Sequence, residues 1–116
     1  MNDKNDITLQ GRLTRDAEVK YTNTGTALAN IAIASNYSYK KGDDWTDEVS
    51  YFDVVAWGKL AEAQAELKKG TPVIVFGRLK QERWQVQDGA TRSRVNVVAD
   101  KIVVTVSARK EAPDGA

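Results

Sequence analysis

The 116-residue chain contains neither cysteine nor histidine. These absences exclude Cys and His nucleophiles, imidazole bases, and thiolate or imidazole ligands for a metal ion. They also exclude the disulfide scaffold that holds many small secreted domains together. A chain of this length forms one domain with a hydrophobic core of its own. The sequence therefore predicts a single folded unit that needs no disulfide, metal or other cofactor.

Long apolar runs are absent as well, and no segment approaches the length that spans a membrane. The N-terminal residues 1–6 are polar and partly acidic, unlike a signal or transit peptide. We therefore expect a cytoplasmic protein with no membrane partner.

A strong excess of either charge is also missing, because the formal net charge is only +1. The chain as a whole thus lacks the basic signature of many nucleic-acid binders. Between Lys59 and Lys101, however, there are nine Lys or Arg and only five acids. Acids crowd residues 43–48 instead, without the glycine and terminal glutamate of a calcium loop. The sequence is consistent with a local basic surface and equally with an ordinary mixed surface.

Alternating apolar and polar residues predict five strands, over about 7–14, 27–36, 49–57, 73–84 and 92–106. Residues 40–44 are predicted to form a polar loop, and Asp88-Gly89 a hairpin turn. One helix is predicted over about 59–69, with Gly70 as its C-cap. The order predicts an all-β, five-stranded barrel of the oligonucleotide/oligosaccharide-binding (OB) type, with the helix between the third and fourth strands. The domain is expected to span residues 1–106, followed by a short disordered tail over 107–116.

The most informative stretch runs from Tyr51 to Glu62. Strand alternation places Tyr51 and Trp57 on one face, about 20 Å apart, while Val54 and Ala56 point the other way. Two rings at that spacing suit a long ligand with flat groups. For a lone Trp in a strand, completion of the barrel core is the ordinary interpretation.

Other aromatic residues are interleaved with cations. Tyr39 precedes Lys40, and Arg83 precedes Trp84 on a strand that also carries Arg78 and Lys80. Arg94 is expected across the hairpin from this segment, and Tyr21 follows a lysine near a turn. Rings that stack bases and cations that follow a phosphate backbone are what single-strand binding requires. No carboxylate pair for acid–base catalysis and no phosphate-binding glycine loop occurs, so we expect no enzyme.

Several ordered motifs resemble the DNA-binding domain of the bacterial single-stranded DNA-binding proteins, over roughly Asn5 to Val106. They are Leu9-Gln10-Gly11-Arg12-Leu13, Asp16-Ala17-Glu18-Val19-Lys20-Tyr21, Gly25-Thr26-Ala27-Leu28-Ala29-Asn30, Phe52-Asp53-Val54-Val55-Ala56-Trp57-Gly58-Lys59-Leu60-Ala61-Glu62, Leu67-Lys68-Lys69-Gly70 and Gly77-Arg78-Leu79 leading to Arg83-Trp84.

The resemblance implies base stacking by Tyr39, Tyr51, Trp57 and Trp84. It implies phosphate contacts near Lys59, Lys69, Lys80 and Arg83. Further candidate contacts are Tyr21, Lys40, Arg78 and Arg94.

The function implied is non-enzymatic, sequence-independent binding and protection of single-stranded DNA in replication, recombination and repair. A homotetramer located at the bacterial nucleoid is expected. The alternative is an adaptor on the same barrel, part of a primosome-like complex and acting mainly through protein contacts. Family members usually end in an acidic, hydrophobic tip that recruits replication and repair enzymes. The only acidic residues beyond residue 106 in this sequence are Glu111 and Asp114, so such recruitment is not expected.

Overall fold

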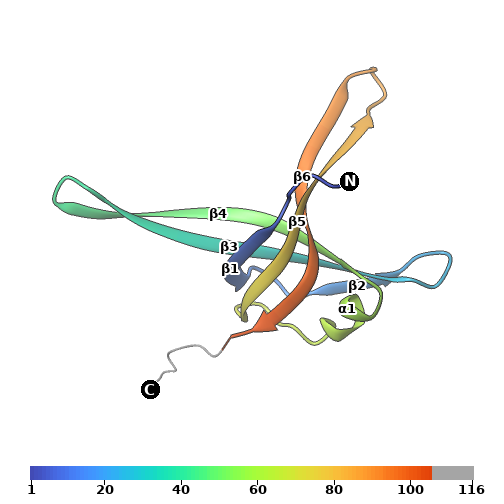
Figure 1. Ribbon diagram of the computed structural model, residues 1–116, viewed down its shortest axis with the longest axis horizontal. Coiled ribbons are helices and arrows are strands. Elements are labelled where there is room, and N and C mark those ends of the chain that lie inside the picture. Colours follow the sequence, from blue (N-terminus) through green and yellow to red (C-terminus); the bar gives the residue numbers. More distant parts are fainter. Residues whose placement is uncertain (106–116) are drawn as a thin grey trace.

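The computed structural model describes residues 1–105, whose strands form a barrel with two projecting hairpins (Figure 1). The elements are β1 (Ile7–Leu13), β2 (Glu18–Tyr21), β3 (Ala27–Lys41), β4 (Asp44–Trp57), α1 (Gly58–Ala63), β5 (Pro72–Gln85) and β6 (Thr91–Val104). The strand order is β1-β5-β6-β4-β3-β2, and an additional pairing of β1 with β3 closes five of these strands into a barrel. The predicted all-β barrel with one short helix is confirmed.

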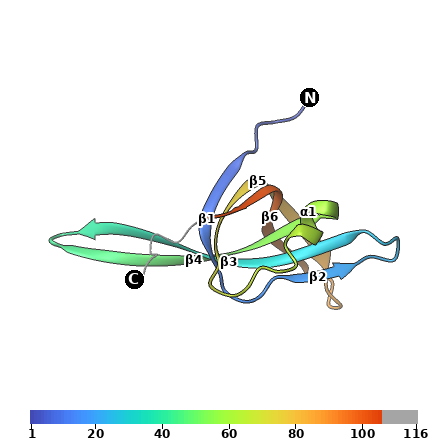
Figure 2. The same ribbon diagram turned by 90° about the horizontal axis from the view of Figure 1, so that it is seen from below.

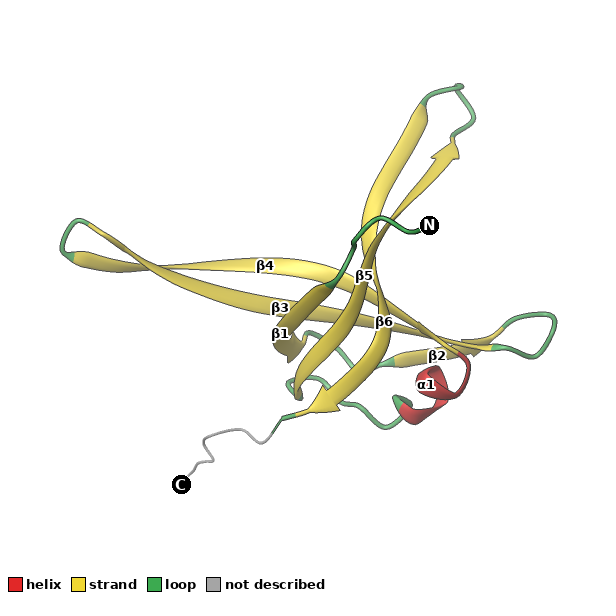
Figure 3. Ribbon diagram, viewed as in Figure 1, coloured by secondary structure: helices red, strands yellow, loops and turns green. Residues whose placement is uncertain are grey.

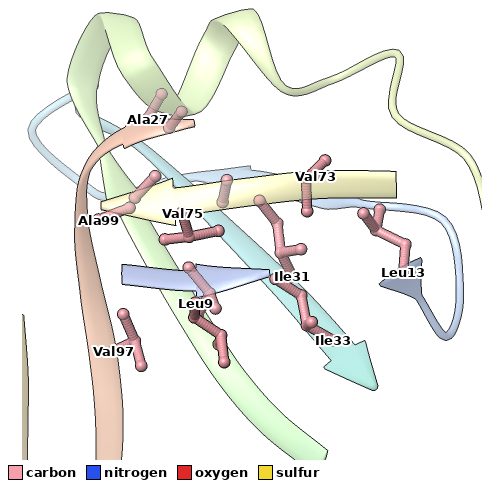
Figure 4. Packing of buried hydrophobic residues seen from close by; sticks show 13 residues of the cluster. Leu9, Leu13, Ala27, Ile31, Ile33, Val73, Val75, Val97 and Ala99 are labelled. Carbon is pink, nitrogen blue, oxygen red and sulfur yellow. The ribbon is translucent and has the colours of Figure 1, made fainter. Parts of the chain in front are cut away.

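The barrel encloses one hydrophobic cluster, to which β1 contributes Leu9 and Leu13 and the other barrel strands contribute small or β-branched side chains (Figure 4). Ile31, Ile33, Val54, Val73, Val75 and Val97 are its largest fully buried members. On β4, Val54 and Ala56 are buried while Tyr51 and Trp57 are exposed. The predicted alternation of β4 is therefore confirmed, and neither ring completes the core.

The helix is shorter than the sequence suggested. The prediction of about 59–69 is wrong at its C-terminal end, because α1 stops at Ala63 and i→i−3 hydrogen bonds continue to Leu67. Tertiary hydrogen bonds replace the last helical turns: the Ala17 amide donates to the Leu67 carbonyl at 2.9 Å, and the Gly70 amide donates to the Leu13 carbonyl at 2.8 Å. Gly70, with a φ of +88°, lies seven residues beyond the end of α1, so it serves this turn and not a helix end.

The predicted polar loop over 40–44 is also wrong. β3 and β4 stay paired out to Lys41 opposite Asp44, so only Gly42 and Asp43 form the turn. Cross-strand pairing alone extends this hairpin, because nothing in residues 36–49 is buried. We call residues 36–49 the arm; it extends away from the side that carries α1 and β2 (Figure 2). The four-residue β2, on the outer edge of β3, was not predicted because its pattern is too short.

The predicted turn at Asp88-Gly89 is confirmed: the Val86 amide donates to the Ala90 carbonyl at 3.0 Å, and this turn joins β5 to β6. The two strands shift register between Phe76 and Gly77. A side chain at Gly77 would collide with the Val98 carbonyl, so glycine lets the two backbones approach closely here.

The last predicted strand ends at Val104, and the predicted tail over 107–116 lies outside the described residues. No helix within residues 1–105 is long and apolar enough to cross a membrane. α1 packs against β3 and β4, at the end of these strands opposite the arm (Figure 3).

Candidate nucleic-acid interface

Tyr51 and Trp57 are held on one face of β4 by pairing with β3. Their partners in the register are Ala34 and Leu28, so small or apolar side chains flank both rings. Tyr51 is 73% exposed and Trp57 is 48% exposed. Because the opposite face of β4 supplies the core, these rings are presented outward on a rigid strand.

Trp84 is presented by the β5–β6 hairpin. Pairing of Trp84 with Arg92, Glu82 with Arg94 and Lys80 with Asn96 puts these residues in one row on one face. The Arg94 guanidinium carbon lies 5.8 Å from the Trp84 ring centre, a cation–π contact. Arg94 Nε also donates to Glu82 Oε1 at 3.1 Å. Arg94 thus lies over one face of the Trp84 ring, and the ring, 45% exposed, keeps accessible surface elsewhere.

A hollow of about 460 Å³ joins these two faces. We call it the Trp57 hollow. Residues from five strands, β2 to β6, and from the β1–β2 connection line it, among them Arg15, Asn30, Asp53, Trp57, Arg94 and Asn96. Its volume falls in the range of ligand sites, roughly 300–1,000 Å³. The base of one hairpin and the outer face of the β3–β4 sheet therefore form a continuous concave surface.

The Trp57 hollow carries mixed charge. Glu18, Asp53 and Glu82 supply carboxylates, and Arg15 and Arg94 supply guanidinium groups. Glu82 is paired with Arg94, and Glu18 forms an ion pair with Lys20 at 3.6 Å. Two of the three carboxylates thus have cationic partners, which reduces the repulsion that a phosphate chain would meet.

The structure does not bring Tyr39 to this face. Tyr39 pairs with Thr46, which places it in the opposite row of the hairpin from Tyr51. There its ring lies 6.2 Å from that of Tyr37, with an interplanar angle of 25°. Lys40 pairs with Trp45 in the row of Tyr51, and Trp45 is 70% exposed. The arm therefore carries rings on both of its faces.

The candidate phosphate contacts on the β5–β6 hairpin lie in both of its rows. Lys80 and Arg78 share the row of Trp84, and Arg78 lies 4.0 Å from Asp100. Arg83 pairs with Ser93 in the opposite row. On the surface that contains Trp84, Lys80 is therefore the better placed cation.

Two other candidate phosphate contacts lie near α1. Lys59 is exposed in the first turn of α1, two residues after Trp57. The Lys69 amide donates to Asp16 Oδ1 at 2.8 Å, which ties its loop to the segment of Arg15. Both lysines therefore lie next to chain segments that border the Trp57 hollow.

Tyr21 lies in a different place. It pairs with buried Ala27, so it shares the inward row of β3. Its hydroxyl donates to Glu62 Oε2 of α1 at 3.4 Å. This contact links β2 to the helix and does not place Tyr21 with Trp57.

Sequence reasoning missed Arg15, Asn30, Asp53 and Asn96 as lining residues of the hollow. For the two asparagines a signal existed: each is a single amide within an apolar run, Ala29-Asn30-Ile31 and Val95-Asn96-Val97. Within residues 1–105, no group of three or more acidic side chains is arranged to hold a metal ion.

Residues 4–105 match the model of the single-strand binding protein family. The chain belongs to this family. The family resemblance inferred from the sequence motifs is confirmed. Most of the described part of the chain lies within the match.

The chain is similar to two proteins named single-stranded DNA-binding protein. The protein from Treponema pallidum is 48% identical over 88% of this chain and 58% of its own length. The one from Borreliella burgdorferi is 46% identical over 88% of this chain and 70% of its own length. A crystal structure of a deletion mutant of the single-stranded DNA binding protein from Thermus aquaticus superposes with a TM-score of 0.79. That structure is 27% identical, over 88% of this chain and 50% of its own chain.

Proposed function

We propose that this chain binds and protects single-stranded DNA, without catalysis and without a requirement for sequence. The observation that carries the proposal is the exposed Trp57 ring in the Trp57 hollow, with exposed Tyr51 in the row of Asp53 and exposed Trp84 in the row of Glu82, two residues that also line the hollow. Each base has a π-face, so stacking on such rings tolerates any sequence. The relatives' names support the same ligand.

The proposed base-stacking residues are Tyr51, Trp57 and Trp84. Tyr39 is a further base-stacking residue, for single-stranded DNA that passes around the arm to its other face. The proposed phosphate contacts are Lys80, Lys59, Lys69 and Arg83, and the additional candidates are Lys40, Arg78 and Arg94. Tyr21, whose hydroxyl is bonded to Glu62, is the most peripheral candidate, and its removal is expected to change affinity little. A duplex reader needs an element shaped for a groove, and the concave surface offers none. A flexible single strand can follow this surface and stack its bases on the rings.

We also propose a homotetramer that acts at the nucleoid in the bacterial cytoplasm, in replication, recombination and repair. The edge of β1 supports self-association. Residues Ile7 to Gly11 pair with β5 on one side, but on the other side β1 pairs with β3 only from Arg12 onward. An unpaired strand edge is a template for a second chain. Light scattering at micromolar concentration should report four copies, and a monomer would contradict this part of the proposal.

Intrinsic tryptophan fluorescence tests the binding function. Titration with an unstructured oligonucleotide should quench the emission strongly, because stacked bases would lie on Trp57 and Trp84. Affinity should fall as salt is added, since each cation–phosphate contact releases counterions. A chain that shows neither quenching nor salt-dependent binding would instead fit the adaptor that acts through protein contacts.

A further inference from the structure

Asn96 has a buried acceptor that no residue satisfies. It is 4% exposed and lines the Trp57 hollow from β6. Its Nδ2 donates to Glu82 Oε1 at 2.8 Å, whereas its Oδ1 is the one buried side-chain atom without a partner among residues 1–105. Buried polar atoms in native proteins almost always have a partner, so this oxygen calls for a ligand or a water molecule.

The orientation of this amide is fixed by chemistry. A carboxylate only accepts hydrogen bonds, so the side of Asn96 that faces Glu82 has to be the NH₂ group. Glu82 in turn is held by Arg94 at 3.1 Å. The free group of Asn96 is therefore an acceptor, and it cannot become a donor without losing the bond to Glu82.

The other groups that line the hollow also favour a ligand that donates a hydrogen bond to Asn96 Oδ1. Asp53 adds a further carboxylate to the wall of the hollow, whereas Glu18 is paired with Lys20 and Arg94 with Glu82, which leaves Arg15 as the other cation of the lining. The Trp57 ring lines the same hollow. The matching ligand has a flat ring that stacks and an edge that presents N–H groups.

We propose that the Trp57 hollow takes one nucleobase of the bound strand and that Asn96 Oδ1, which is covered in the free chain, accepts a hydrogen bond from its exocyclic amine once the base displaces the side chains around it. This inference rests on the proposed function and adds a base preference to it. Cytosine presents an NH₂ group where thymine presents a carbonyl. A carbonyl at that point would meet the oxygen of Asn96 and nearby carboxylates. Cytosine is therefore favoured over thymine at this one position.

The test compares dC and dT oligonucleotides of equal length at one salt concentration, with the parent chain and Asn96→Leu. Leucine has nearly the same shape as asparagine but no polar atom. One neutral hydrogen bond predicts that the dC-to-dT affinity ratio is about two- to tenfold higher in the parent than in Asn96→Leu. Affinity for dT should stay within about twofold. Asn23→Leu, in the exposed turn before β3, is the matched control and should leave the ratio unchanged.

Glu82→Gln provides a second readout, which also serves if Asn96→Leu does not fold. A glutamine can donate to Asn96, so the amide is free to turn and the dC-to-dT ratio should fall toward that of Asn96→Leu. Unchanged ratios in both folded variants would show that water satisfies Asn96, and the base preference would be wrong. If the parent binds neither oligonucleotide, the proposed function itself fails, which is a different result.

Discussion

The same two strands, β3 and β4, behave differently in their barrel half and in the arm. In the barrel half, buried residues such as Ile31 and Val54 alternate with exposed ones such as Trp57. In the arm the pairing continues without a register shift, yet no residue is buried. Backbone pairing therefore needs no core, whereas the alternation of burial exists only where the barrel closes over one face.

Because only the barrel half of β3 and β4 has a buried face, it alone is expected to contribute strongly to the free energy of unfolding. The barrel half contributes to the free energy of unfolding through its inward face and presents Trp57 on its outward face. The arm has aromatic residues on both faces, among them Tyr37 and Trp45, and neither face contributes to the core. Substitutions in the two halves should therefore separate effects on unfolding from effects on affinity.

The largest expected effect is on stability in the barrel half. Ile33→Ala should lower the free energy of unfolding by about 2–5 kcal/mol, because Ile33 is fully buried and its loss leaves a cavity. Tyr37→Ala in the arm should change it by only about 0.5 kcal/mol, since the side chain is mostly exposed. Urea unfolding measures both; equal losses would mean that the arm is part of the cooperative core.

The next effect is on affinity. Trp57→Ala should weaken binding of a single-stranded oligonucleotide about 5- to 150-fold, the equivalent of about 1–3 kcal/mol of stacking. Tyr21→Ala, which removes a ring on the helix side, is expected to stay within about threefold of the parent. Fluorescence anisotropy of a labelled oligonucleotide measures both constants. A folded Trp57→Ala variant with parental affinity would show that this ring is not a stacking site.

A smaller effect compares the two faces of the β5–β6 hairpin. Lys80→Gln removes a cation from the row of Trp84 and should lower the slope of log affinity against log salt by about one. Arg83→Gln, in the opposite row, should lower it less. Titrations at several salt concentrations give the slopes; a larger change for Arg83→Gln would move the phosphate path to the other face.

The smallest effect is expected within the arm. The Ser38 hydroxyl donates to Asp47 Oδ1 at 2.6 Å, but both residues are exposed. Ser38→Ala should therefore change the free energy of unfolding by at most about 0.5 kcal/mol. A loss of 2 kcal/mol or more in urea would show that this hydrogen bond organises the arm.

The sequence predicted the strands of the barrel and the exposure of Tyr51 and Trp57, because both follow from local periodicity. The helix was expected between the third and fourth strands and lies between β4 and β5, because β2 was not predicted. The length of the arm was not predicted, since its strands have no buried face and thus no alternating pattern. α1 was predicted too long because hydrogen bonds to distant residues such as Ala17 and Leu13 end it. Asn96 entered the site only when β6 was placed beside β4, a pairing between segments about 40 residues apart.

The central claim is that bases stack on the concave surface around the Trp57 hollow. Photocross-linking tests it directly: an oligonucleotide with 5-iodouracil is irradiated in complex with the chain, and the adducts are mapped by mass spectrometry. We expect adducts on Trp57, Tyr51 and Trp84. Adducts confined to Tyr21 and the helix side, with none on these three rings, would contradict it.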